Sequence, residues 1–141
     1  MDKLNEFLGK FNFTPNLCLK IGVERECFLL NKDKQISPLA PMVLEHLGVN
    51  GKFGFELSAC QLEDRIGPCH INEVKEQLQN NEALIKEAQE RLGFFRNFQE
   101  VGPEDMSLEI FPDPTGRYQK LVKDMPNLVL ASACRVIGTH V

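Results

Sequence analysis

The chain has 141 residues, of which 43% are hydrophobic and 26% are charged, with a formal net charge of −4. This size and composition are typical of one globular domain, and they exclude a long disordered chain or a collagen-like repeat. The negative charge excludes the basic surface of a nucleic-acid-binding protein, and no apolar run reaches the ~18–20 residues of a membrane helix. The first residues lack the apolar core of a signal peptide, so we expect a cytoplasmic protein without nucleic-acid or membrane partners.

The first half of the chain predicts a helix, a long strand and a second, short helix. Apolar residues at helical spacing over 3–11 predict the leading helix, and from residue 17 to Leu30 the period becomes two, which predicts the strand. One face of this strand is expected to carry Leu19, Ile21, Val23, Cys27 and Leu29. The other face is expected to carry Lys20, Gly22, Glu24 and Glu26. A turn at 31–34 and a helix over 41–47, ended by Gly48, follow.

A second strand is predicted after the turn signal Asn50-Gly51. Its apolar phase changes near Ala59-Cys60, which indicates one inserted residue, either a β-bulge or a break. This insertion would place Glu56 and Glu63 on the same side of the sheet, although an odd number of residues separates them.

The clearest predicted element is a helix of about six turns, because apolar residues recur at alternating spacings of three and four over 71–92. Packing of this helix against the sheet is the favoured interpretation, and an oligomer seam with Asn81 as its polar residue is the alternative. A third strand over 94–101, a loop over 109–114 and a helical turn over 118–123 follow, and 128–141 is expected to run from helix into strand. The predicted fold class is α+β, an antiparallel sheet with carboxylates on one face and helices packed on the other.

The carboxylates are the first candidate site. Glu24 and Glu26 project about 6.5–7 Å apart from one strand face, and a solvated edge strand would explain them. Their apolar flanks favour a central strand instead, where clustered carboxylates are costly unless a cation joins them. Glu56 and Glu63 add two carboxylates on the same side. Such hard oxygen ligands suit Mg²⁺ or Mn²⁺, and magnesium sites usually include substrate phosphates.

Other motifs are weaker. The sequence contains no P-loop, no Rossmann glycine motif and no nucleophile motif, so we predict no catalytic residue from it. The five cysteines form no Cys-x-x-Cys pair and are expected to be reduced and mostly buried. His140, near the end of the chain, is by itself best explained as a surface or core residue. Arg117 is either a clamp for phosphate or carboxylate or a residue at the start of a helix.

Taken in order, these segments resemble the N-terminal part of the glutamate–cysteine ligase family, in the branch with bacterial carboxylate–amine ligases and plant-type enzymes. The resemblance extends from about residue 18 to the end and rests on order and spacing rather than on one decisive motif. The matching segments are Gly22–Leu30, Glu56-Leu57, Gln61-Leu62-Glu63, the helix ending in Leu92-Gly93, Pro112 with Arg117-Tyr118, and Gly138–Val141.

The resemblance implies a glutamine-synthetase-like fold, in which a curved antiparallel sheet holds ATP and metal ions on its concave face. Enzymes of this family, which serve glutathione biosynthesis, use ATP to phosphorylate the γ-carboxylate of glutamate, and the amine of cysteine then attacks the acyl phosphate. The resemblance further implies that the ligands of the metal or of Mg–ATP are Glu24, Glu26, Glu56 and Glu63. It implies a metal or phosphate contact for His140 and substrate binding for Arg117.

The chain also departs from this family. Arg25 stands where relatives are often acidic, and family members are much longer than 141 residues. We therefore expect residues 1–141 to form a single domain, the N-terminal portion of a larger ligase catalytic domain, and to be inactive alone. The alternatives are a sister ligase with another acceptor amine and a non-catalytic assembly module. The latter would form a homo-oligomer through the 71–92 helix and an exposed sheet edge.

Overall fold

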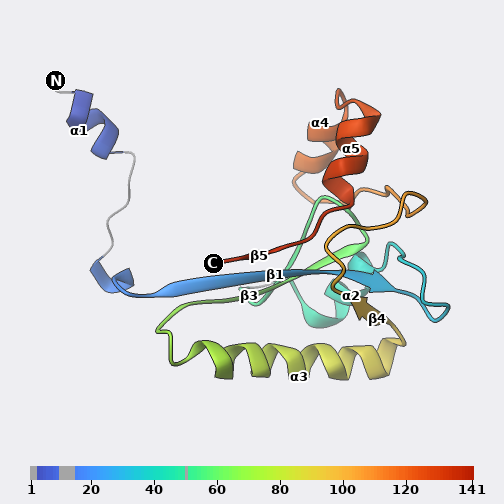
Figure 1. Cartoon of the computed structure of the whole chain (residues 1–141), viewed down its shortest axis with the longest axis horizontal. Helices are drawn as coiled ribbons and strands as arrows, with labels where there is room; N and C mark the ends of the chain where they lie inside the picture. The colour runs from blue at the N-terminus through green and yellow to red at the C-terminus, as the bar shows by residue number, and fades with distance from the viewer. Residues whose placement is uncertain (1–2, 10–14, 50) are drawn as a thin grey trace.

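The computed structural model describes residues 3–9, 15–49 and 51–141, and these form an open antiparallel sheet with helices around it (Figure 1). The strands are β1 (Ile21–Leu30), β2 (Phe53–Phe55), β3 (Gln61–Cys69), β4 (Phe95–Asn97) and β5 (Thr139–His140). The helices are α1 (Lys3–Leu8), the 3-10 turn η1 (Pro15–Leu17), α2 (Ala40–Leu47), α3 (Val74–Leu92), α4 (Arg117–Val122) and α5 (Asn127–Cys134). The strand order is β2-β3-β1-β4, and β5 also pairs with β1. The predicted α+β class and the antiparallel sheet are confirmed.

Strand β1 is the centre of the sheet and has the predicted alternation. Val23, Cys27 and Leu29 are buried and belong to the clusters that pack against α3. The glutamates of β1 point to the opposite face, because successive residues of a strand alternate between faces. Leu19 departs from the prediction: it precedes the strand, has a positive φ of 58° and is 87% exposed.

The predicted second strand is in fact a β-hairpin. Strands β2 and β3 pair antiparallel, with Gly54 opposite Glu63 and Phe55 opposite Leu62. The connection over 56–60 is held by backbone bonds to neighbouring segments, including one from the Ala59 N–H to the Glu109 carbonyl oxygen at 2.8 Å. Of the two irregularities expected near Ala59-Cys60, the structure has the break and not the bulge: β2 ends at Phe55, the chain reverses, and β3 begins at Gln61.

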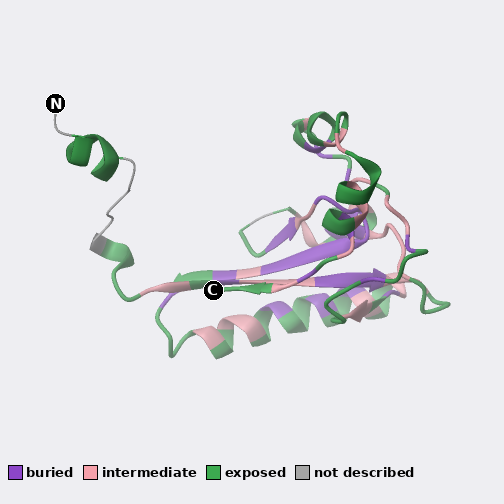
Figure 2. Ribbon diagram, turned by 45° about the horizontal axis from the view of Figure 1, so that its top comes forward, coloured by how far each residue is buried: buried purple, intermediate pink, exposed green. Residues whose placement is uncertain are grey.

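Helix α3 packs against the sheet, as predicted. Asn81, Ile85 and Ala88 are its buried residues, and Figure 2 shows buried and exposed positions alternating along the helix. The Asn81 side-chain amide donates to Asp64 Oδ1 at 2.6 Å and to the Arg65 carbonyl oxygen at 2.8 Å. Asn81 therefore joins the helix to β3, and this buried face does not form an oligomer seam.

Three apolar clusters of buried residues pack on the sheet. The largest joins α2, α3, β1, β2 and β3 with Tyr118 of α4 and Cys134 of α5, and within it the rings of Phe55 and Phe111 stack at 4.3 Å. A smaller one lies on the face away from α3 and consists of Phe28, Cys60, Met106 and Ile137. On that same face, the Gln61 side-chain amide donates to the carbonyl oxygens of Cys134, at the end of α5, and Val136. The expectation that the helices pack on one face only is therefore wrong. The end of α5 contacts the face away from α3, because the chain passes over that face before it forms β5 (Figure 1).

Residues 128–141, which periodicity alone does not assign, run from α5 through Val136 into β5. The third strand is shorter than predicted and ends at Asn97. The predicted leading helix ends at Leu8, while residues 10–14 and Asn50 of the expected turn lie outside the described residues. None of the helices within the described ranges is both long and apolar enough to cross a membrane.

Candidate functional site

Three of the predicted glutamates share the sheet face opposite α3, here called the carboxylate face. Glu26 lies directly opposite Glu63 across the β1–β3 ladder, and Glu24 lies opposite Arg65. Glu56 follows β2 and lies near enough to feel the charges of Glu63 and Glu26. The structure thus brings the four glutamates to one region, and the irregularity between Glu56 and Glu63 is a break between β2 and β3, one of the two predicted alternatives.

The Glu56 carboxyl carries the clearest electrostatic signal of this region. Its burial, together with the negative charges of Glu63 and Glu26, raises its pKa from 4.5 to about 7. Mutual repulsion among carboxylates is relieved either by a proton or by a bound cation. A carboxyl with such a pKa, close to other carboxylates, is a candidate functional group.

Arg65 supplies the positive charge of the carboxylate face, and the sequence analysis missed it. Its Nη2 forms a hydrogen-bonded ion pair with Glu63 Oε2, and its Nε lies 3.8 Å from Glu24 Oε1. Burial raises the pKa of Glu63, while the Arg65 hydrogen bond opposes this shift. The available signal was the spacing, because Arg65 stands two positions after Glu63 and thus shares its face.

Gly54 provides the space for this ion pair. A Cβ at this position would lie 2.6 Å from Arg65 Nη2 and 2.8 Å from Glu63 Oε2. Because Gly54 is directly opposite Glu63 in the β2–β3 ladder, any larger residue would push the guanidinium away.

Glu26 and His140 connect β5 to the carboxylate face. Glu26 Oε2 accepts a hydrogen bond from the Gly138 N–H at 2.8 Å, and the Glu26 N–H donates to the Gly138 carbonyl oxygen at 2.9 Å. His140 pairs with Glu24 in the sheet, and its Nδ1 lies 3.9 Å from Glu24 Oε2. Glu26 therefore holds the start of the β5 segment, which places His140 beside Glu24.

Arg25 and Arg117 lie apart from the four glutamates. Arg25 is on the α3 face, where its guanidinium pairs with Asp64, so it does not neutralise the carboxylate face. The Arg117 guanidinium lies over the Tyr118 ring at 4.6 Å, and the Arg117 backbone N–H donates to Asp113 Oδ2 at 3.2 Å. Hydrogen bonds from Thr115 lower the pKa of Asp113, a carboxylate that accepts N–H groups at the start of α4. These contacts support the helix-start interpretation of Arg117.

The donor chemistry of the carboxylate face fits a hard divalent cation, since carboxylate oxygens are the ligands that Mg²⁺ and Mn²⁺ prefer. Within the ranges that the structure describes, however, no three His, Cys, Asp or Glu side chains form a group that could hold a metal ion. Arg65 pairs with Glu63 and Glu24, and Glu26 is engaged by Gly138. A cation at Glu24 and Glu56 would therefore compete with Arg65 for the carboxylates.

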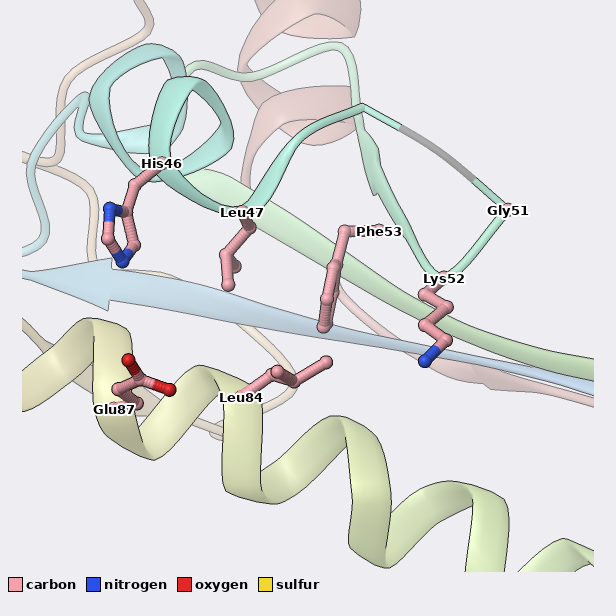
Figure 3. Close-up of a pocket in the computed structure, with 7 residues that line it drawn as sticks. All are labelled: His46, Leu47, Gly51, Lys52, Phe53, Leu84 and Glu87. Atoms are coloured by element: carbon pink, nitrogen blue, oxygen red, sulfur yellow. The ribbon is translucent and has the colours of Figure 1, made fainter.

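Two cavities differ in their relation to these residues. A cavity of about 410 Å³ on the carboxylate face is lined by Glu24, Arg65 and His140 together with Gly22, Gly67 and Pro68. A cavity of about 540 Å³ lies between α2, β2 and α3 (Figure 3). In Figure 3, Phe53 and Leu84 face each other at its centre, with His46 and Glu87 at one end and Lys52 at the other. None of the predicted site residues lines this second cavity.

Four of the cysteines are buried, as expected. Burial raises the pKa of Cys27 to about 12 and that of Cys60 to about 11, so both are thiols at neutral pH. Cys69 and Cys134 are also buried, whereas Cys18 is exposed, and all five are free.

No protein-family model matches this sequence, and no curated protein and no solved structure matches it either. Any functional assignment therefore rests on the chemistry of the carboxylate face and on the family resemblance of its sequence segments. The residues that carry this chemistry are Glu24, Glu56 and Glu63, with Arg65, His140 and the supporting Glu26.

Proposed function

We propose that this chain is the metal- and nucleotide-binding part of an ATP-dependent carboxylate–amine ligase of the glutamate–cysteine ligase type, with a glutamine-synthetase-like sheet. The observation that carries the proposal is the gathering of Glu56 with Glu63 and Glu26, where burial first and then the charges of these two carboxylates raise the pKa of Glu56 to about 7. In this role Glu24, Glu56 and Glu63 would bind Mg²⁺ or Mn²⁺, and His140 would contact the ion or a phosphate. Arg117 is proposed for substrate binding by the family resemblance alone.

In the proposed reaction, the γ-phosphoryl group of ATP moves to the γ-carboxylate oxygen of glutamate and leaves ADP. The amine of cysteine, or of another acceptor, then forms the amide bond and displaces phosphate. Divalent cations in such sites neutralise the charge of the polyphosphate and of the transferring group. Glu26 supports the site by holding Gly138, and the Arg65 hydrogen bond opposes the rise that burial causes in the pKa of Glu63.

The proposal is tested by titrating the chain with Mn²⁺ and following the electron paramagnetic resonance of the free ion. We expect Glu56→Gln to weaken binding about tenfold, a loss of ~1.4 kcal/mol, since it removes an ionisable oxygen ligand. Glu45→Gln is the matched control, because Glu45 is an exposed glutamate on α2, away from the predicted ligands. Affinity should also rise from about pH 6 to about pH 8, because the ion competes with the proton that Glu56 retains near neutrality.

Two results would contradict the proposal. One is the absence of saturable Mn²⁺ binding up to about 10 mM, since a dissociation constant above this value is too weak for a functional ion site. The other is equal binding by the wild type, Glu56→Gln and Glu45→Gln, which would mean that the ion sits elsewhere.

The assembly module is the second candidate function. The α3 face with Ile85 and Ala88 does not support it, because both residues are fully buried within the chain. The observation that favours it is the group of exposed apolar side chains beside β5, at Phe98, Val101 and Val136.

A further inference from the structure

The Arg65 guanidinium fills the space between two of the proposed metal ligands. Its Nη2 forms a hydrogen-bonded ion pair with Glu63 Oε2, and its Nε lies 3.8 Å from Glu24 Oε1. Gly54, opposite Glu63 on β2, leaves room for this contact. Among the described residues, Arg65 is the one Lys or Arg that forms an ion pair with any of the four glutamates. The carboxylate face thus already holds a cation, and this cation belongs to the chain itself.

Burial shows which partner of the pair is able to move. The Glu63 side chain is 3% exposed, whereas the Arg65 side chain is 38% exposed. Arg65 Nε is buried and donates no hydrogen bond within the described part of the chain, so the guanidinium is held by one close contact and one longer one. A partly exposed side chain on a long stem can rotate into solvent, while a buried residue within a sheet cannot.

A divalent cation and the guanidinium require the same carboxylate oxygens. Mg²⁺ lies about 2.1 Å from its oxygen ligands, closer than the ~2.8 Å of an N–H contact to a carboxylate, and it carries twice the charge of a guanidinium. Two cations that share these oxygens repel each other. Binding of the ion is therefore an exchange, and the free energy needed to break the Arg65 pairs lowers its affinity.

The displaced guanidinium has a cavity beside it. Arg65 lines the cavity of about 410 Å³ on the carboxylate face and is the only Lys or Arg among the residues that line it. A guanidinium presents its N–H donors in one plane and binds phosphate or carboxylate through two parallel hydrogen bonds. Because Arg65 is paired with Glu63 and Glu24 in the structure, the cavity gains a cationic side chain for an anion when the ion breaks these pairs.

We propose that Arg65 is an exchangeable internal cation of the carboxylate face: a divalent ion displaces its guanidinium, which then binds a phosphate or carboxylate group in the adjoining cavity. Cation and anion consequently bind with positive coupling, and each raises the affinity of the other by the same factor. This inference rests on the proposed metal site and deepens it, since it assigns the coupling between ion and anionic ligand to one side chain.

Mn²⁺ titration of the whole chain at about pH 8, followed by electron paramagnetic resonance, tests the exchange. Arg65→Gln removes the competing charge and should bind Mn²⁺ about tenfold more tightly than the wild type. Arg91→Gln is the matched control, because Arg91 is exposed on α3 and its loss changes the net charge equally, and it should leave the affinity unchanged. Circular dichroism melting of both variants checks that the fold is retained.

The anion is tested with methyl phosphate against chloride at equal ionic strength, and the Mn²⁺ bound by methyl phosphate alone is measured without protein and subtracted. Methyl phosphate should tighten Mn²⁺ binding by the wild type about fivefold and that by Arg65→Gln by less than about twofold. The increase in the wild type depends on no variant, so it remains informative if Arg65→Gln fails to fold.

The outcomes separate this inference from the proposed function. If the wild type binds Mn²⁺ and Arg65→Gln binds it no more tightly, the exchange is overturned while the metal site stands. An equal effect of methyl phosphate on the wild type and on Arg65→Gln overturns the assignment of anion binding to Arg65. Binding by Arg65→Gln alone would mean that the ion does not displace the guanidinium, which also overturns the exchange. Absence of binding in both chains contradicts the proposed function, and the inference falls with it.

Discussion

At the scale of single residues, the raised pKa of Glu56 makes the free energy of unfolding depend on pH. The sequence shows a glutamate after a short apolar strand, with nothing to distinguish its titration from that of other glutamates. The raised pKa of about 7 arises from partial burial and from Glu63 and Glu26, which are brought close only by the fold.

This raised pKa predicts a pH dependence of stability. Because folded Glu56 holds its proton more tightly than the unfolded chain, its contribution to stability is full below pH 4.5 and is lost as the pH rises through about 7. Glu56→Gln should therefore increase the free energy of unfolding at about pH 8 by about 1–2 kcal/mol, a value discounted for the partial exposure of the carboxyl. Near pH 4.5 the variant and the wild type should be equally stable, because both are uncharged in the folded state.

Urea denaturation at the two pH values measures this difference, with Glu45→Gln as the control at an exposed glutamate. Parallel pH profiles for the wild type and Glu56→Gln would contradict the raised pKa of Glu56 in the folded chain.

At the scale of elements, the long helix was predicted well and the strands less so. The spacing over 71–92 defined α3 to within a few residues, because one helix face must be apolar along its whole length to pack on a sheet. The β2–β3 hairpin was missed because residues 53–66 contain a single phase change. A bulge and a chain reversal both shift the alternation of apolar residues in the sequence, and only the strand pairing in the structure distinguishes them.

The contact between α3 and β3 predicts that substitution of Asn81 lowers the free energy of unfolding much more than substitution of its neighbour Asn80. Asn81 is 2% exposed and donates to Asp64 and to the Arg65 carbonyl oxygen, whereas Asn80 is exposed. Asn81→Ala leaves buried acceptors without a donor and should lower the free energy of unfolding by about 2–3 kcal/mol. Asn80→Ala, the matched control, should change it by less than about 0.5 kcal/mol. Urea denaturation of both variants tests this, and equal losses would contradict the role of Asn81 in joining helix and sheet.

At the scale of the whole molecule, the carboxylate face is closed at one end and open at the other. Phe28 and Ile137 are buried beneath the segments that return to β5, while the end with Glu24, Arg65 and His140 is a cavity of about 410 Å³. A reaction through an acyl phosphate needs water to be excluded and two substrates to be aligned. The side chains lining this cavity include none from α3, α4 or α5.

This arrangement predicts that the purified chain does not form the amide product, even if it binds Mn²⁺. With ATP, Mg²⁺, glutamate and cysteine, we expect no γ-glutamylcysteine above the level seen with Glu24→Gln, which removes one proposed ligand. Mass spectrometry of the products provides the measurement. Product formed by the wild type and lost in Glu24→Gln would mean that residues 1–141 complete a catalytic site by themselves.

The sequence by itself determined the α+β class, the face of β1 on which Glu24 and Glu26 lie, and the long helix, because each depends on a local period of two or 3.6 residues. Tertiary structure alone decided the β2–β3 reversal, the pairing of Arg65 with Glu63 and the bond from Gly138 to Glu26. These contacts depend on which strands lie next to each other, and the packing of the whole sheet determines that arrangement. Even the Glu63–Arg65 pair, two residues apart, requires Gly54 of the neighbouring strand to leave it space.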